Sequence, residues 1–286
     1  MDIVRRAMGI RDIVRRARAA GLRVGFVPTM GALHEGHRSL IRAVNESTDV
    51  SVVSVFVNPT QFGPGEDFER YPRDQAADVD ACVAAGVDYL FLPEPDEIYR
   101  AGASTHVEVD GLSDRLEGAS RPGHFRGVAT VVTKLLNIVG PHVVAFGEKD
   151  AQQATVIRRL VEDLFLDVEV QIRPTVRDED GLALSSRNQR LDDDERAAAA
   201  AIPRALEAVE RLVQEGETGG EKIAEAARTV IESEPLLRVD YAELVDRKTF
   251  ARVDSLDKEG MLVLAVHCGT TRLLDNIRLS PARASA

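Results

Sequence analysis

The residues best suited to chemistry lie near the N-terminus, in the run Pro28-Thr-Met-Gly-Ala-Leu-His-Glu-Gly-His37. Its two imidazoles, His34 and His37, stand three residues apart, so that on a helix they share one face within a single turn. Gly31 permits an unusual turn, and Gly36 removes a side chain between the imidazoles, so that a ligand can come close. Helix N-termini favour anions through their first N–H groups and their dipole. The run therefore predicts a phosphate site.

Two other interpretations of this histidine pair are open from the residues alone. The histidines could cap a helix or lie on its surface, and an isolated His-x-x-His pair favours this about as strongly as a ligand site. They could also bind zinc, which we disfavour because no third Cys or His lies in helical register nearby. The adjacent glycines, the preceding strand and further polar clusters favour the anion site.

A second cluster, Val57-Asn-Pro-Thr-Gln-Phe-Gly63, follows a predicted strand. In open α/β sheets, ligands bind outside the carboxyl ends of the strands. The amide of Gln61 both donates and accepts hydrogen bonds, which suits a hydroxyl or carboxylate group. For Asn58 and Pro59, a turn built by the Asn-Pro pair explains the residues equally well.

A third cluster, Phe146-Gly-Glu-Lys-Asp-Ala-Gln-Gln153, again joins a strand to a helix. Lys149 offers a point charge for phosphates, and Asp150 offers a carboxylate for Mg²⁺ or a ribose hydroxyl. Gln153 is expected on the first turn of the helix. A Lys-Asp pair at a helix start is usually solvated, and its position at the carboxyl end of a strand is what makes it a candidate.

Two polar loops complete the candidates. The segment Leu184-Ser-Ser-Arg-Asn188 groups two hydroxyls with a guanidinium, which are donors suited to the β- and γ-phosphate oxygens, although taken alone it is a polar loop. The basic loop 121–127 makes Arg121, His124 and Arg126 available to anions, and we expect at least one of the three to be structural.

Strand and helix patterns alternate through the first two thirds of the chain, which indicates a parallel sheet with helices on both faces. The expected strands are 24–27 (ending at Pro28), 50–58, 89–92, 143–146 and 168–172, and the expected helices are 33–44, 74–85, 125–139 and 151–164. Beyond about residue 178, helices are expected at 192–215 and 221–232 and strands at 239–245, 261–266 and 271–279.

These patterns predict an α/β fold with two domains. A Rossmann-like parallel-sheet domain that binds the ligands, residues 1–177, is followed by a smaller α+β C-terminal lid domain, residues 178–286. The polar segment Arg177–Asn188 is expected to be the hinge between them. The N-terminus reads DIVRRA twice, at Asp2–Ala7 and Asp12–Ala17, and we expect an Arg-rich amphipathic surface helix there.

Composition limits the partners. The chain has 286 residues, 44% of them hydrophobic, and a formal charge of −11, which argues against a nucleic-acid partner. Its longest apolar stretches are strand-sized, so no membrane span is expected. Cys82 and Cys268 have no metal-type spacing, and a reducing cytoplasm is the expected compartment.

The motifs PTMGALHEGH, FVNPTQF, YPRD, RPGHFRGV, FGEKDAQQ and LALSSRN occur in this order. Together they resemble the pantothenate synthetase family (pantoate–β-alanine ligases), from about Gly25 to Asn188 with high specificity and more loosely to the end. The first motif alone marks the wider H-x-G-H nucleotidyltransferase superfamily, which includes class I aminoacyl-tRNA synthetases. Residues 184–187 stand where those synthetases carry a KMSKS-type loop.

The resemblance implies a role for each matching residue. His37 would be the catalytic proton donor, with His34 beside it, and Gln61 and Gln153 would bind pantoate, with Gln61 also touching β-alanine. Contacts to ATP are implied for Met30, Gly31, Ala32, Leu33, His34, Glu35, Gly36, His37, Gly147, Glu148, Lys149, Asp150, Val176, Leu184, Ser185, Ser186 and Arg187.

The reaction that the resemblance implies has two steps. The pantoate carboxylate attacks the α-phosphorus of ATP and releases pyrophosphate, and the amine of β-alanine then attacks the pantoyl adenylate and releases AMP. The resemblance also implies a homodimer and Mg²⁺. The resemblance does not identify the residues that would bind the metal ion.

Three alternative functions remain open from the sequence. Another nucleotidyltransferase of this fold, making a dinucleotide or a CDP-alcohol, would not need Gln61 and Gln153 together. An aminoacyl-tRNA synthetase is disfavoured by the acidic charge and by the lack of an anticodon-binding extension. A nucleotide-binding regulatory protein without catalysis is disfavoured because His34, His37, Lys149 and Arg187 are all present.

Overall fold

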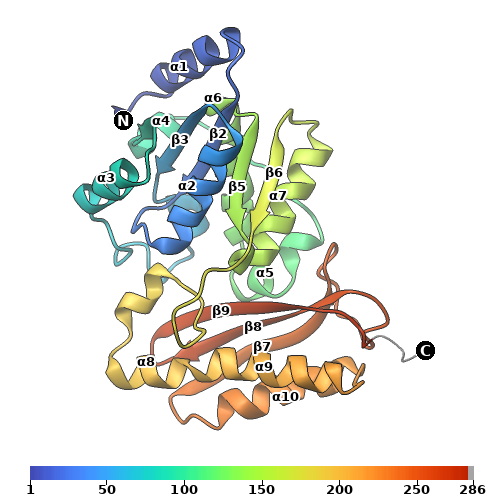
Figure 1. The fold of residues 1–286 in the computed structure, drawn as a ribbon. Helices are drawn as coiled ribbons and strands as arrows, with labels where there is room; N and C mark the ends of the chain where they lie inside the picture. The colour runs from blue at the N-terminus through green and yellow to red at the C-terminus, as the bar shows by residue number, and fades with distance from the viewer. Residues whose placement is uncertain (283–286) are drawn as a thin grey trace. The chain divides into compact units, whose positions relative to one another are not determined.

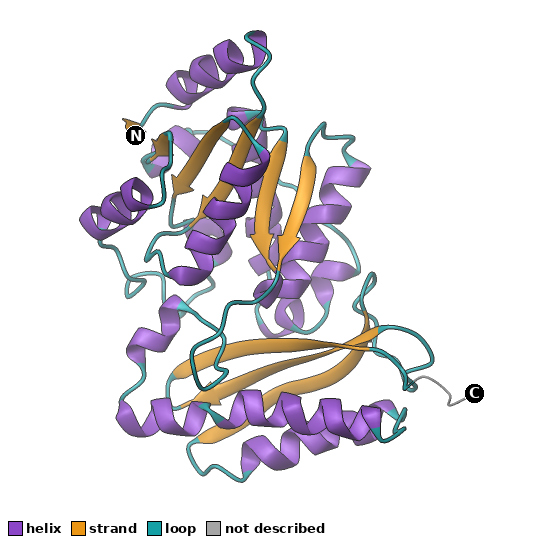
Figure 2. Ribbon diagram, in the orientation of Figure 1, coloured by secondary structure: helices purple, strands orange, loops and turns teal. Residues whose placement is uncertain are grey.

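Short β-branched runs before residue 174 pair into one parallel sheet of six strands, in the order β1-β4-β3-β2-β5-β6 (Figures 1 and 2). The computed structural model describes residues 1–282. The strands are β1 (Asp2–Val4), β2 (Val24–Thr29), β3 (Val50–Val55), β4 (Tyr89–Phe91), β5 (Val143–Gly147) and β6 (Glu169–Arg173). The helices of this part are α1 (Ala7–Ala19), α2 (Glu35–Ser47), α3 (Gln75–Ala84), α4 (Pro95–Ile98), α5 (Glu117–Ser120), α6 (His124–Val139) and α7 (Ala151–Asp163), with short 3₁₀ turns η1 (Pro59–Gln61), η2 (Leu112–Asp114) and η3 (Glu148–Asp150).

The two faces of this sheet are covered by different helices. On one face, the apolar stripe of α2 (Leu40, Ile41 and Val44) packs with Val27 of β2 and Val53 of β3. Because side chains alternate along a strand, the neighbouring Phe26 points to the opposite face, and α1 and α6 contact β2 as well. The expected Rossmann-like α/β arrangement is confirmed.

The middle of the sheet opens toward its carboxyl edge. Strand β2 pairs with β3 as far as Thr29, but it pairs with β5 only as far as Phe26. We expected the strand to end at Pro28, which was wrong, because Pro28 lacks an N–H but still lies in register with Ser54 of β3. The end of β2 is therefore bound on one side only.

The N-terminus differs from our expectation in one respect. The second DIVRRA copy lies in α1, the expected surface helix. The first copy begins with strand β1, which pairs in parallel with β4 through Ile3 and Leu90, so the prediction of a helix was wrong for Asp2–Val4.

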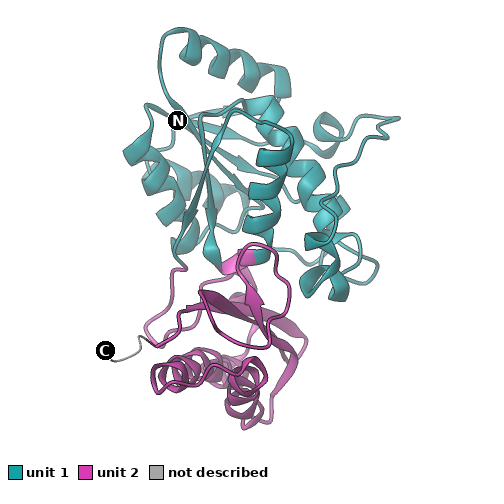
Figure 3. Cartoon of the chain, turned by 90° about the vertical axis from the view of Figure 1, so that its right-hand side faces the viewer, with its two compact units in different colours: residues 1–148, 152–174 teal, residues 149–151, 175–286 magenta. Residues whose placement is uncertain are grey.

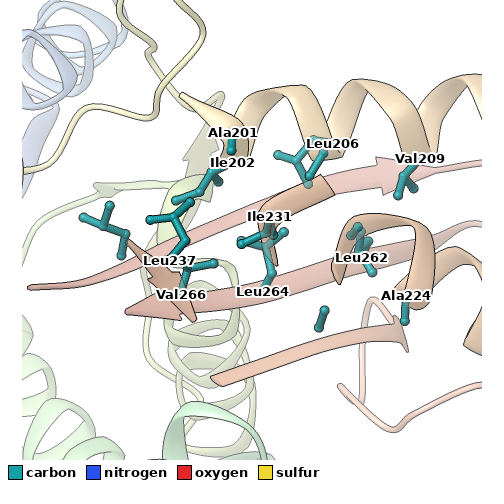
Figure 4. Close-up of a cluster of buried hydrophobic side chains, with 14 of the residues drawn as sticks. Ala201, Ile202, Leu206, Val209, Ala224, Ile231, Leu237, Leu262, Leu264 and Val266 are labelled. Atoms are coloured by element: carbon teal, nitrogen blue, oxygen red, sulfur yellow. The ribbon is translucent and has the colours of Figure 1, made fainter. Parts of the chain in front are cut away.

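Residues beyond 174 form a three-stranded antiparallel sheet, β7 (Leu237–Asp246), β8 (Gly260–Cys268) and β9 (Thr271–Leu279), covered by helices. The helices are α8 (Asp193–Ala199), α9 (Ala201–Gln214) and α10 (Gly220–Glu232), preceded by the 3₁₀ turn η4 (Ser186–Arg190). Ile202 and Leu206 of α9 and Ile231 of α10 pack on Leu262 and Leu264 of β8 in one apolar core (Figure 4).

The single helix expected at residues 192–215 was wrong. The structure has two helices that meet at Ala200. Pro203 explains the break, because a proline in a helix interior has no N–H to donate and its ring clashes with the carbonyl of the residue four positions earlier, here Ala199.

The chain divides into two compact units (Figure 3). The first comprises residues 1–148 and 152–174, and the second comprises residues 149–151 together with those from Thr175 on. The division into a ligand-binding domain, 1–177, and a lid, 178–286, concerns function and stays a proposal.

The expectations for membrane segments and for cysteines can also be compared with the structure. Among residues 1–282, no helix is both long and apolar enough to cross a lipid bilayer. Cys82 and Cys268 are buried and are not joined in a disulfide.

Candidate active site

The order of the strands locates a switch point in the first unit. From β2 the chain proceeds through β3 to β4 on one side of the sheet, and β5 and β6 lie on the other side. In open α/β sheets, ligands bind in the crevice outside the carboxyl ends of the strands at such a point. The turn after β2 and the turn after β5 therefore flank the expected binding position.

The turn after β2 is held by a buried carboxylate. Gly31 has a φ of +87° and Ala32 a φ of +50°. Asp78 of α3 accepts the N–H groups of Ala32 and Leu33 at 3.2 and 2.8 Å. A Cβ on Gly31 would lie 2.6 Å from Oδ2 of Asp78, so glycine is required there both for its conformation and for its lack of a side chain.

Asp78 was not among the residues that the sequence singled out. Its side chain is buried, and burial raises the pKa of Asp78 above its usual range, although the two backbone N–H donors oppose the shift. Asp78 lies one turn before the buried Cys82 on the apolar side of α3, which was the available signal, but only the fold brings this helix to the turn.

The two imidazoles cap α2. His34 is the N-cap residue, with an extended backbone, and its Nδ1 accepts the N–H of Gly36 at 3.2 Å. Nδ1 of His37 accepts the N–H of His34 at 3.3 Å, which completes a reciprocal capping box. The ring centroids are 4.2 Å apart. The expectation that both residues lie on the helix was therefore wrong for His34, although the rings do lie together.

The reason we gave for Gly36 also needs correction. A Cβ at this position would lie 2.9 Å from Nδ1 and Cε1 of the His34 ring. The glycine therefore makes room for the capping imidazole. Room for a ligand is not what the contact indicates.

These capping bonds fix the protons of both rings. A backbone N–H can only donate, so Nδ1 of His34 and Nδ1 of His37 must both be acceptors. In the neutral form, each ring therefore carries its proton on Nε2. Both imidazoles offer an N–H donor from Nε2, which is the chemistry that a phosphate oxygen requires.

Gln61 lies beside this turn. Its side chain is buried, Oε1 accepts from Nδ2 of Asn58 at 3.1 Å, and Nε2 donates to Sδ of Met30 at 3.1 Å. Asn58 caps η1, as the Asn-Pro pair predicted, but its buried amide also donates to the carbonyl of Gly127 at 3.2 Å. The structure thus brings Met30 and Gln61, from two different predicted clusters, into contact.

The basic loop 121–127 is turned inward and supports Gln61. Arg121 binds both carboxylate oxygens of Glu66 at 2.9 and 2.6 Å. Nδ1 of His124 lies 2.9 Å from the carbonyl oxygen of Gln61. Arg121 and His124 are therefore structural, as expected for at least one of the three basic residues, whereas Arg126 is exposed.

The cluster after β5 contains two adjacent glutamines with different surroundings. Gln152 is buried, and its amide binds the backbone of Leu112, Arg115 and Glu117. Gln153 is half-buried on the first turn of α7, as expected, and no hydrogen bond of its side chain occurs within residues 1–282. Gly147 ends β5, and Glu148 begins η3.

The remaining candidates belong to the second unit. Lys149, Ser185 and Arg187 line one small pocket, together with Arg272 and Asp275 of β9. Nζ of Lys149 lies 3.5 Å from the carboxylate of Asp150. The structure therefore joins two clusters that are far apart in the sequence.

Hydrogen bonds hold the segment around this pocket. Oγ of Ser185 accepts the N–H of Arg187 at 3.3 Å and caps η4, whose first residue, Ser186, is buried. Leu184 donates its N–H to the carbonyl of Val176 at 3.0 Å. Asn276 of β9 donates to the carbonyl of Lys149 at 2.9 Å. Both predicted phosphate-binding segments are thus fixed by the second unit's own backbone and side chains.

The expected hinge at Arg177–Asn188 is not a loose segment. Arg177 forms a two-bond ion pair with the buried Asp275 at 2.7 and 2.9 Å. Leu182 belongs to the apolar core of the second unit. The change from one compact unit to the other comes earlier, between Pro174 and Thr175, and the hinge role of the segment stays a proposal.

No metal site is built from protein groups alone in the part of the chain that the structure describes. Within residues 1–282, no group of three or more His, Cys, Asp or Glu side chains is arranged to hold a metal ion. Mg²⁺ in nucleotide sites is often bound by one or two carboxylates together with the phosphates of the substrate. The half-exposed carboxylate of Asp150, next to Lys149, fits that kind of site.

Comparison with protein families and relatives identifies the family of this chain. The family model of pantoate-beta-alanine ligase matches residues 2–278. A pantothenate synthetase of Herpetosiphon aurantiacus is 51% identical over 265 residues, which are 92% of this chain and 96% of the relative. A second, of Thermodesulfovibrio yellowstonii, is 49% identical over 278 residues, covering 97% and 99%.

Solved structures give the same result. The crystal structure of pantothenate synthetase from Thermus thermophilus superposes with a TM-score of 0.93 at 42% identity, covering 98% of this chain and 100% of that one. The ligase from Francisella tularensis, complexed with beta-gamma ATP and beta-alanine, has a TM-score of 0.81 at 34% identity and covers 97% of both chains. The resemblance found in the sequence motifs is confirmed, and the chain belongs to the pantoate–β-alanine ligase family.

Proposed function

We propose that this enzyme condenses pantoate with β-alanine to pantothenate through a pantoyl-adenylate intermediate, with release of pyrophosphate and AMP. The observation that carries the proposal is the contact between Met30 and Gln61. It joins the helix-capping turn, suited to phosphate, to a buried amide, suited to a hydroxy acid, beside the switch point of the sheet. A reaction between a carboxylate and the α-phosphate of ATP needs these two sites side by side.

The first step forms a bond between a pantoate carboxylate oxygen and the α-phosphorus. The bond from that phosphorus to the bridging oxygen of the β-phosphate breaks, and pyrophosphate leaves. Negative charge shifts onto the phosphate oxygens during this step, so preorganised N–H donors stabilise its transition state. We assign that role to the Nε2–H groups of His37 and His34, whose Nδ1 atoms are occupied by the capping bonds.

The second step forms the amide. The β-alanine amine attacks the acyl carbon, the bond from this carbon to the AMP oxygen breaks, and the nitrogen loses a proton. Gln61 and Gln153 would hold pantoate through both steps, with Gln61 also contacting β-alanine. The Francisella relative, complexed with beta-gamma ATP and beta-alanine, supports ATP and β-alanine as substrates.

The family resemblance also assigns residues to ATP. In the first unit these are Met30–His37 with Gly147 and Glu148, and in the second they are Lys149, Asp150, Val176 and Leu184–Arg187. The pocket shared by Lys149, Ser185 and Arg187 supports the assignment of those three to phosphate oxygens. Bound Mg²⁺ would neutralise part of the phosphate charge, and Asp150 is the carboxylate we assign to it.

Three expectations remain proposals beyond the site. A lid formed by the second unit would exclude water from the hydrolysable adenylate. A homodimer, which the family resemblance implies, would be detected by light scattering of the purified protein. A cytoplasmic location agrees with the two reduced cysteines and would be tested by fractionating cells.

The decisive experiment measures nucleotide products. With labelled ATP, continued turnover to AMP and pyrophosphate should require both pantoate and β-alanine, in amounts equal to the pantothenate formed, whereas pantoate alone should release at most about one pyrophosphate per active site. A stable dinucleotide or CDP-alcohol product would indicate another nucleotidyltransferase of this fold. Nucleotide binding without any product would indicate a regulatory protein and would contradict the proposal.

A further inference from the structure

A partly buried network of side chains surrounds the backbone of Gln61. Its carbonyl oxygen lies 2.9 Å from Nδ1 of His124 and 3.4 Å from Nη2 of Arg121. Nε2 of His124 lies 3.3 Å from Nη1 of Arg121, and Arg121 is held in turn by both oxygens of Glu66. Glu117 approaches the same guanidinium at 4.0 Å. The four side chains form a continuous support around one carbonyl group.

The partners of His124 determine which nitrogen carries its proton. A carbonyl oxygen can only accept, so Nδ1 must donate to Gln61. A guanidinium can only donate, so Nε2 must accept from Arg121. His124 is therefore a neutral imidazole protonated on Nδ1. With both nitrogens engaged, this ring has neither a proton nor a lone pair to offer a substrate.

The electrostatics agree with this geometry. Burial, and next the charge of Arg121, lower the pKa of His124 to about 4. In Glu66, burial would raise the pKa, but the bonds and charge of Arg121 outweigh it and hold the pKa below the usual value. At neutral pH the network therefore has a charged Arg121–Glu66 pair and an uncharged ring.

The backbone around Gln61 is held from the same direction. Helix α6 begins at His124, and its Gly127 lies against η1 so closely that a Cβ there would be 2.4 Å from the carbonyl oxygen of Thr60 and 2.7 Å from Cα of Gln61. The same glycine accepts the amide of Asn58, which in turn donates to Oε1 of Gln61. The start of α6 thus fixes both the main chain and the side chain of Gln61.

We infer that His124 and Arg121 are positioning residues for pantoate, which hold the carbonyl of Gln61 so that its amide faces the substrate. The inference rests on the proposed function, because it assumes that Gln61 binds pantoate. It assigns His124 the role of a fixed donor. The imidazole would then act neither as an acid or base nor as an anion ligand.

Replacing His124 by Asn and by Gln separates these roles. Nδ2 of Asn and Nδ1 of His are both bonded to Cγ, so His124→Asn keeps a donor near the Gln61 carbonyl. His124→Gln moves the donor further along the side chain. His124→Ala removes it, and His106→Ala, at an exposed histidine, is the control.

Steady-state kinetics with pantoate and ATP varied in turn give the readout. In His124→Ala and His124→Gln the KM for pantoate should rise about fivefold, within the range of one lost hydrogen bond and no more than in Gln61→Ala. His124→Asn should stay within about twofold of the unmodified enzyme, and the KM for ATP should change less than about twofold in all variants. Thermal unfolding identifies any variant that fails to fold. If His124→Ala fails to fold, the comparison of His124→Asn with His124→Gln still tests the inference.

Several outcomes would overturn the inference. Equal losses in His124→Asn and His124→Gln would mean that the imidazole itself is required, and a rise confined to the KM for ATP would assign His124 to the nucleotide. Gln61→Ala separates the inference from the proposed function. If Gln61→Ala impairs pantoate use but His124→Ala does not, only the inference is wrong. If Gln61→Ala leaves pantoate use unchanged, the proposed role of Gln61 fails first.

Discussion

The turn after β2 and the start of α6 both place histidines against the backbone, but with opposite proton positions. At the turn, Nδ1 of His34 and Nδ1 of His37 accept backbone N–H groups, which leaves each proton on Nε2. At α6, Nδ1 of His124 donates to a backbone carbonyl, and Nε2 accepts from Arg121. The first arrangement places the N–H donors on Nε2, away from the helix cap, and the second uses both nitrogens for support.

This difference shows how the same side chain acquires a role from its backbone partner. When a backbone N–H donates to Nδ1, a neutral imidazole carries its proton on Nε2 and can donate from there. When Nδ1 donates to a backbone carbonyl and Nε2 accepts from an arginine, neither nitrogen remains for a substrate. The spacing of histidines in the sequence does not contain this information. Only the partner, which the fold supplies, decides it.

The largest effect is expected at His37. Removing a donor to charge that develops in the transition state commonly lowers the rate about 10²- to 10³-fold. His37→Ala should fold, bind ATP within modest limits and form the adenylate this much more slowly, with a defect of the same kind in His34→Ala. Single-turnover quench of labelled ATP with pantoate alone, before β-alanine is added, measures that step directly.

The control at this position is the same replacement, His by Asn, that is expected to preserve pantoate use at His124. His37→Asn keeps an acceptor near the N–H of His34 but offers no donor at the place of Nε2. It should restore the helix cap and remain slow, opposite to the expected result for His124→Asn. If adenylate formation by His37→Ala were normal and the defect appeared only after the amine is added, His37 would act in the second step.

The next largest effects are expected from substitutions of the residues that support the two regions. Asp78 accepts two N–H groups of the turn after β2. An amide in its place can accept only one of them and turns its own NH₂ toward the other. Leaving a buried donor unpaired costs about 1–3 kcal/mol, so Asp78→Asn should lower both thermal stability and kcat.

A matched control lies on the same helix. Asp74 is the N-cap of α3 and accepts the N–H of Ala77 at 3.0 Å, and Asn caps helices about as well as Asp does. Asp74→Asn should therefore leave stability and activity nearly unchanged. Equal losses in the two variants would mean that Asp78 supports the helix in general and not the turn.

The neutral ring of His124 predicts an acid-side loss of stability. Its folded pKa is about 4 against 6.5 for an ordinary histidine, so below pH 6.5 the unfolded chain binds a proton that the folded one does not. Its contribution to stability is therefore complete above pH 6.5 and decreases as the pH falls. Between that pH and about pH 5 the decrease amounts to about 2 kcal/mol.

Urea unfolding followed by circular dichroism at about pH 7 and about pH 5 measures this loss. His124→Asn cannot titrate, so the difference between the two pH values should shrink by the same amount. The neighbouring carboxylate does not interfere in this window, since the bonds and charge of Arg121 hold the pKa of Glu66 below its usual value. An unchanged difference in the Asn variant would mean that His124 is protonated in the folded enzyme.

Sequence patterns predicted most of the elements, because strand and helix periodicity are local properties. They failed where a distant partner decides. Asp2–Val4 and Asp12–Val14 have the same three residues, yet the first pairs with β4 and the second lies in α1. The end of β2 at Thr29 likewise depends on pairing with β3 beyond Pro28.

The same limit applies to the candidate site: its local features were predicted, and those that depend on a distant partner were missed. Gly31 was chosen for its turn, and its positive φ agrees. Asp78 was missed because nothing near it in the sequence indicates that α3 reaches the turn. Arg121 and His124 were grouped with possible anion ligands because the sequence shows only that they are basic. Their actual partners, the carboxylate of Glu66 and the carbonyl of Gln61, lie more than fifty residues away in the chain.

The smallest effect is expected from single amides that would bind pantoate. Each lost hydrogen bond to an uncharged group costs ~0.5–1.5 kcal/mol, so Gln153→Ala should raise the KM for pantoate a few-fold and leave ATP binding unchanged. Gln61→Ala should cost somewhat more, because it also removes one of the two acceptors of the buried Asn58 amide. The neighbouring Gln152→Ala is the informative comparison, since its amide binds only backbone of the first unit and should lower thermal stability with little change in the KM for pantoate. Steady-state kinetics and thermal unfolding of the three variants test this together. A raised KM for ATP alone in Gln153→Ala would assign that residue to the nucleotide.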